Sequence, residues 1–98
     1  MYSPIQELEQ LTQKIEFNTA TLPDYQRYEE LLLQSGLPRN YIYSYLRRAG
    51  FNSWEDFVAA RRSKERRQMI SGAIIGGLVG LGLGVLFYDL LVEEGEEQ

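Results

Sequence analysis

The sequence contains neither cysteine nor histidine among its 98 residues. A chain without thiols or imidazoles has no disulfide, no cysteine nucleophile and no ordinary zinc, haem or iron–sulfur ligand set. Carboxylates offer no replacement, because Glu29 and Glu30 are consecutive on a predicted helix and point apart, and no glycine-rich loop follows a predicted strand. We therefore expect no catalytic residue, no metal site, no cofactor and no small-molecule substrate.

Basic residues are missing from the last part of the chain. Residues 69–98 carry five acidic side chains and no Lys or Arg. Residues 35–68 hold eight basic and three acidic residues, whereas residues 1–34 hold two basic and six acidic ones. The small net charge of −4 thus hides three blocks of alternating sign.

Charged side chains are also absent from residues 68–88, and residues 69–88 form an apolar run of 20 residues. As a helix, this run would span about 30 Å, the thickness of a hydrocarbon core. The alternative is a buried core helix of a soluble protein, but so short a chain has few residues to cover a helix that is apolar on every side. The run predicts a single transmembrane helix over 69–92.

The flanks of the run predict its orientation. The basic juxtamembrane segment 61–68 precedes it, and the acidic tail 93–98 follows it. Because Lys and Arg stay on the cytoplasmic side, we expect a cytoplasmic, stromal or matrix N-terminus. The segment is either a topology signal alone or a site for anionic lipid headgroups. Its basic residues are Arg61, Arg62, Lys64, Arg66 and Arg67.

Glycines recur every four residues inside the apolar run, at Gly72, Gly76, Gly80 and Gly84. This spacing places them on one stripe of a helix, where missing side chains let another helix approach closely. The stripe is typical of a glycine zipper and predicts a helix-packing face, although Gly77 and Gly82 lie off it. The partner is either a different protein or a second copy of this chain.

Residues 1–62 predict short helices, which makes the expected fold all-α: three to four short helices followed by one transmembrane helix. An amphipathic helix ends at about Glu16, a linker follows to residue 20, and a compact helical domain covers 21–62. We expect the first helix to stay unpacked until it docks on a partner, because its apolar stripe is thin. Between Trp54 and Gly72 no Pro or Gly intervenes, so the fourth helix is expected to continue unbroken into the membrane.

The apolar positions of the last three short helices predict a shared core. Its expected members are Leu22, Tyr25, Tyr28, Leu32, Leu37, Ile42, Tyr45, Leu46, Phe51, Trp54, Phe57 and Val58. Tyr41, Tyr43 and Tyr45 cannot all be buried on one helix face. We expect Tyr43 to face outward beside Arg47 and Arg48, forming a candidate docking surface.

These features favour a non-enzymatic, single-pass accessory or assembly subunit of a larger integral membrane protein complex. A self-associating oligomer that acts as a scaffold or pore is the main alternative. A membrane-tethered nucleic-acid binder is a minor one, since residues 47–53 join two helices as in a helix-turn-helix. Its would-be recognition helix opens with Trp54, Glu55 and Asp56, so we expect no nucleic-acid partner. Glutamine-rich, cysteine-free helices beside a glycine-rich anchor favour a bacterial plasma membrane or a thylakoid membrane.

Overall fold

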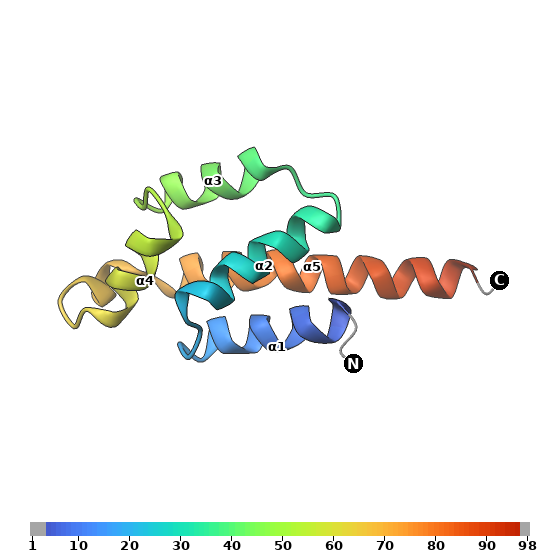
Figure 1. The fold of residues 1–98 in the computed structure, drawn as a ribbon, viewed down its shortest axis with the longest axis horizontal. Helices are drawn as coiled ribbons and strands as arrows, with labels where there is room; N and C mark the ends of the chain where they lie inside the picture. Colours follow the sequence, from blue (N-terminus) through green and yellow to red (C-terminus); the bar gives the residue numbers. More distant parts are fainter. Residues whose placement is uncertain (1–3, 97–98) are drawn as a thin grey trace.

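The computed structural model describes residues 4–96, with only the backbone described for residues 69 and 89–96. The described chain is all-helical, as predicted, and has no strand (Figure 1). Its elements are α1 (Pro4–Glu16), α2 (Leu22–Gln34), α3 (Arg39–Arg48), α4 (Trp54–Arg62), a short 3₁₀ helix η1 (Arg66–Met69) and α5 (Gly72–Glu96).

Local signals set the ends of the short helices. Thr21 and Asp24 form a reciprocal capping box at the start of α2, and the Ser53 hydroxyl accepts a hydrogen bond from Asp56 N at the start of α4. Gly36, with φ of 110°, turns the chain after α2. The predicted end of the first helix at about Glu16 is confirmed.

Helix α1 lies beside α5 and α2 and runs antiparallel to α5 (Figure 1). Its stripe of Leu8, Leu11 and Ile15 is almost fully buried. The Arg27 guanidinium on α2 adds two hydrogen bonds to the Glu7 carboxylate, at 2.8 and 2.9 Å, and lowers the pKa of that carboxyl. The expectation of an unpacked first helix is therefore wrong, because α5 supplies the apolar surface that α1 lacks on its own.

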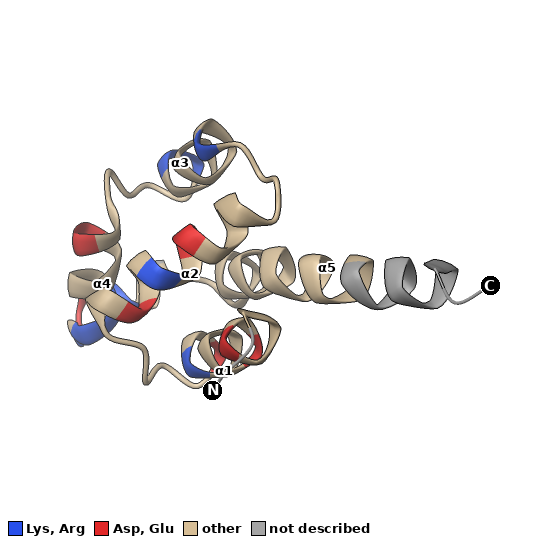
Figure 2. Ribbon diagram, turned by 45° about the vertical axis from the view of Figure 1, so that its right-hand side comes forward, with Lys and Arg blue, Asp and Glu red and all other residues tan. Residues whose placement is uncertain are grey.

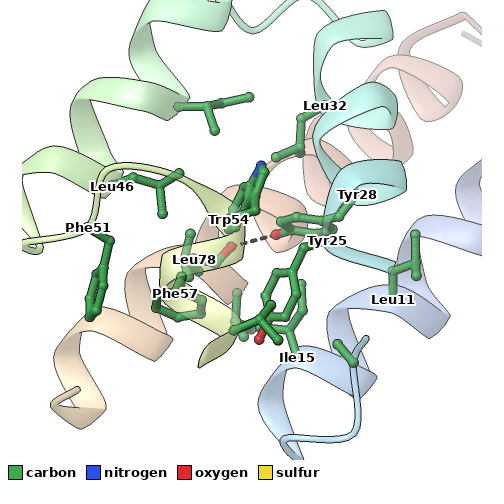
Figure 3. Packing of buried hydrophobic residues seen from close by; sticks show 14 of the residues in the cluster. Leu11, Ile15, Tyr25, Tyr28, Leu32, Leu46, Phe51, Trp54, Phe57 and Leu78 are labelled. Carbon is green, nitrogen blue, oxygen red and sulfur yellow. Dashed lines mark hydrogen bonds between the residues drawn. The ribbon is translucent and has the colours of Figure 1, made fainter. Parts of the chain in front are cut away.

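Aromatic rings fill the space between α2 and α4 (Figure 3). Tyr25 stacks on Trp54 with ring centroids 5.2 Å apart, and Phe57 meets Tyr25, Trp54 and Phe51 edge to face. Such contacts add stability beyond the burial of the rings, about 0.5–1.5 kcal/mol per pair. This aromatic cluster joins α4 to the bundle of α1, α2 and α5.

Most of the predicted core is confirmed. The buried members are Tyr25, Tyr28, Leu32, Ile42, Leu46, Phe51, Trp54, Phe57 and Val58. Leu22, Leu37 and Tyr45 are only partly buried and pack against the cluster. Buried residues outside the prediction are Leu8, Leu11, Ile15, Ala20, Leu31, Ala60, Leu78 and Val79. Helices α1 and α5 therefore share one core with α2 to α4.

The connection between α4 and α5 is broken, which corrects the prediction of a continuous helix. Ser63 leaves the helical conformation, with ψ of 128°, and its hydroxyl accepts a hydrogen bond from Arg66 N. Ser71 then caps α5 by accepting from Ile74 N at 3.3 Å. Serine side chains that bond to nearby backbone amides compete with helix continuation, so no Pro or Gly is needed for the break.

Tyr28 fixes α5 against the bundle (Figure 3). Its hydroxyl donates a hydrogen bond to the Leu78 carbonyl and accepts one from Gly82 N at 2.8 Å. These two backbone groups are the i and i+4 partners of a regular α-helix, so the tyrosine bridges them. A Cβ built at Gly82 would lie 2.6 Å from the Tyr28 hydroxyl, which is closer than real side chains allow. Tyr45 makes a similar contact near Gly77 by donating to the Ile74 carbonyl at 2.7 Å.

Residues 72–88 of α5 include no charged residue, whereas charged residues lie on α1 to α4 and in the segment 64–67 (Figure 2). Within the part of the chain that is described, no helix combines the length and the apolar character needed to cross a membrane. The acidic tail predicted over 93–98 lies outside the described side chains.

Replacing Gly82 with alanine tests the close contact with Tyr28. Overpacking of this kind costs about 1–3 kcal/mol, against a gain of about 1 kcal/mol in helix propensity. We expect Gly82→Ala to lower the free energy of unfolding, measured by urea denaturation. Gly80→Ala is the matched control, because nothing lies within 4 Å of a Cβ built there, and it should be neutral or stabilising. Equal effects of the two changes would contradict the contact.

Alkaline pH tests the burial of the Tyr28 hydroxyl. Burial raises the pKa of Tyr28 from 10.0 to about 12. The unfolded chain therefore loses this proton first, and the free energy of unfolding should fall by about 1.4 kcal/mol per pH unit between about pH 10 and 12.

Tyr28→Phe removes the titrating group without changing the ring. Burial also raises the pKa of Tyr25 and Tyr45, so we expect a shallower slope in this variant and not a flat one. Urea denaturation across the alkaline range measures both slopes. An unchanged slope would show that the Tyr28 hydroxyl loses its proton at the same pH in the folded and in the unfolded chain, which contradicts the raised pKa.

Candidate helix-docking site

The four stripe glycines, Gly72, Gly76, Gly80 and Gly84, all lie on the exposed side of α5. A Cβ built at any of them meets no heavy atom within 4 Å. By contrast, a Cβ at Gly77 or Gly82 would collide with a tyrosine hydroxyl. The glycines that contact the rest of the described chain are thus the two that fall off the predicted stripe.

Two large apolar side chains continue this uncovered side. Leu83 is 48% exposed and Phe87 is 68% exposed. The spacing from Gly76 to Gly80, Leu83 and Phe87 is four, three and four residues, which places them on one helix face. We call this surface the open face of α5. Its members are Gly72, Gly76, Gly80, Leu83, Gly84 and Phe87.

The open face borders a groove of about 520 Å³ between α5 and the turn that joins α2 to α3. Gly80 and Gly84 line it from α5, and the half-exposed ring of Tyr41 lines it from α3. Its lining is mostly apolar, with Leu37, Leu81 and Val85 as further members. Side chains from a docked helix therefore have a recess beside the glycines.

The predicted docking surface on α3 is only partly exposed. Arg47 and Arg48 are exposed in the last turn of the helix. Tyr43 is partly buried and packs against the core, which corrects the expectation that it faces outward. Tyr41 is the exposed tyrosine of this helix, at 52%. The sequence does not indicate which of Tyr41 and Tyr43 is exposed, because a tyrosine ring suits the half-buried edge of α3 at either position.

The predicted basic segment is divided by the break at Ser63. Arg61 is buried at the end of α4, whereas Arg62, Lys64, Arg66 and Arg67 are exposed. Arg66 forms an ion pair with Asp56, with Nη2 and Oδ1 3.0 Å apart. Four of the five predicted basic side chains are therefore exposed at the surface near the start of α5.

Acidic side chains give no sign of a metal centre: none of the described residues form a group of three or more that could hold an ion.

The heptad-like spacing of Leu83 and Phe87 with the glycines is visible in the sequence and places these two residues on the same helix face as the stripe. The contacts of Gly77 and Gly82 were not readable, because they depend on tyrosines far away in the chain. A general signal existed for Tyr28 and Tyr45, since a buried tyrosine hydroxyl needs a hydrogen-bond partner.

No protein-family model matches the chain, and neither the curated proteins nor the solved structures contain a match. Function is therefore inferred from the chain's own residues.

Proposed function

We propose that this chain is a non-enzymatic accessory subunit that docks on a larger membrane protein complex through the open face of α5. The observation that carries the proposal is the empty space above Gly72, Gly76, Gly80 and Gly84. Small residues on an apolar helix allow close backbone approach, and van der Waals contact then drives helix association in lipid. The exposed rings and aliphatic side chains nearby would be covered by the same partner.

The proposal includes membrane insertion of residues 69–92, with the N-terminal helices on the cytoplasmic, stromal or matrix side. The apolar run and the basic residues before it support this orientation. The exposed basic side chains Arg62, Lys64, Arg66 and Arg67 would then meet anionic lipid headgroups.

Insertion requires α1 and α2 to release α5. In the structure, Tyr28 and Thr12 lie against Gly82, in the middle of the run that would enter the bilayer. Helix α1 also carries Glu7, Glu9 and Lys14, which are costly in hydrocarbon. The described arrangement is therefore a closed form of the proposed subunit, and the inserted form is an open one.

Bulky substitutions on the open face test the docking. We expect Gly76→Leu with Gly80→Leu to abolish co-purification of the partner complex in mild detergent, because the leucines prevent close helix approach. Changing both glycines to alanine is the matched control and should retain the partner, since alanine is also small. No heavy atom lies within 4 Å of a Cβ built at either position, and the groove beside Gly80 leaves room for a longer side chain, so both variants should fold.

The same pair of variants distinguishes the alternatives. If chemical crosslinking finds oligomers of this chain alone, and the leucines remove them, the open face binds a second copy and the proposal of a larger complex is wrong. If the leucine variant keeps every partner of the wild type, the open face is not the docking site.

A disulfide between α1 and α5 tests the release. A Cβ built at Gly82 lies 2.6 Å from Thr12 Oγ1, so the two Cβ atoms are at most about 4 Å apart, close enough for a disulfide. The chain has no other cysteine to interfere. We expect Thr12→Cys with Gly82→Cys to resist carbonate extraction from membranes when reduced, and to be extracted when it is oxidised before insertion.

Thr12→Cys with Gly80→Cys is the control, because position 80 faces away from α1 and should form no bridge. Extraction of the wild-type chain by carbonate would contradict insertion itself. Equal retention of the oxidised and reduced variants would contradict the need for release.

A further inference from the structure

Arg61 is a buried cation without an acidic partner. It is 9% exposed, and its Nη1 donates hydrogen bonds to the Ile15 carbonyl and to the Tyr25 hydroxyl, the latter at 3.0 Å. Both acceptors are neutral. The ion pairs among the described residues involve Lys14, Arg27 and Arg66, and none involves Arg61. A buried charge normally has a counter-charge, because its desolvation is costly.

The guanidinium borders a small cavity at the junction of α4 with the turn after α1. The cavity measures about 110 Å³, several times the roughly 10–15 Å³ that one water molecule requires. Its lining residues are Asn18, Thr19, Ala20, Tyr25, Val58, Arg61 and Arg62. The cavity therefore has room for a tetrahedral oxyanion.

The lining groups are suited to an anion and not to a cation. Arg61 and Arg62 bring two guanidinium groups, and Asn18 and Tyr25 can each donate a hydrogen bond. The Thr19 hydroxyl already donates to the Lys14 carbonyl. No carboxylate lines the cavity. The C-terminal carbonyls of α1 and α4 oppose an anion with about half a charge each, which together is less than the two positive charges of the arginines.

The turn that carries Asn18 and Thr19 is held in place by backbone hydrogen bonds. Thr19 N donates to the Lys14 carbonyl at 2.9 Å, and Asn18 adopts a left-handed conformation with φ of 60°. The polar side of the cavity is therefore formed before any ligand arrives.

We propose that this cavity binds one phosphate group, with Arg61 as the buried counter-charge and Arg62 as the exposed one. Guanidinium groups match phosphate oxygens in charge and in fork geometry. The group is either free inorganic phosphate or the phosphate of a lipid headgroup, since the cavity lies at the start of the basic segment.

Titration of the full-length chain in mild detergent with inorganic phosphate tests the site by calorimetry. Loss of one charge-assisted hydrogen bond weakens binding about tenfold. We expect that loss for Arg62→Gln, which lies at the surface and should not disturb the fold. Arg67→Gln is the matched control, because it removes the same charge from the same segment outside the cavity and should bind as the wild type does.

Three results would overturn the proposal. Phosphate that binds no better than chloride at equal ionic strength would do so. Equal weakening by Arg62→Gln and Arg67→Gln would indicate diffuse attraction in place of a site. An Arg62→Gln variant with unchanged affinity would place any bound phosphate elsewhere.

Vesicles of phosphatidylcholine and phosphatidic acid in a four-to-one ratio distinguish the two sources of phosphate. If the site takes a lipid headgroup, Arg62→Gln should weaken vesicle binding more than Arg67→Gln does. If it takes the free ion, the two variants should bind vesicles equally while they still differ in the phosphate titration. Either result supports the cavity as a phosphate site.

Discussion

The hydrogen bonds of the Tyr28 hydroxyl constrain the whole arrangement of α5. A buried hydroxyl must be paired, and here its partners are the Leu78 carbonyl and the Gly82 amide. The tyrosine reaches them only because Gly82 has no side chain. Once this contact is made, Leu78 and Val79 are turned into the core. The opposite side of the helix, with Gly76, Gly80, Leu83 and Phe87, is then necessarily left uncovered.

Glycines therefore act in two different ways on one helix. Gly77 and Gly82 admit tyrosine side chains from α3 and α2, so their role is internal. A Cβ built at any stripe glycine meets no heavy atom within 4 Å, so the backbone of α5 is open to an approach from outside. A helix that is apolar on every side needs cover on every side. The bundle supplies half of that cover, and a partner helix or lipid would supply the rest.

What the sequence could predict followed from short-range signals. Thr21 with Asp24, Gly36 and Ser53 mark helix ends through contacts within a few residues. The packing of α1 on α5 was missed because it joins residues far apart in the chain. The break after α4 was missed because Ser63 and Ser71 also fit inside helices. For the candidate site, the glycine stripe was visible, but its separation from Gly77 and Gly82 required the position of Tyr28.

In the proposed function, the balance between the closed form and the proposed inserted form would depend on α1. Burying an aliphatic side chain stabilises a fold by roughly 1.5–3 kcal/mol, and release would expose Leu8, Leu11 and Ile15 to water. Insertion gains only about 0.3–0.6 kcal/mol for each large apolar residue of the run, and it has about ten of them. These opposing contributions are of similar size, so insertion alone does not outweigh the loss of the α1 contacts. A partner helix that binds the open face would favour the inserted form. Docking would then be coupled to the release of α5, so the subunit would open where its partner is present and stay closed elsewhere.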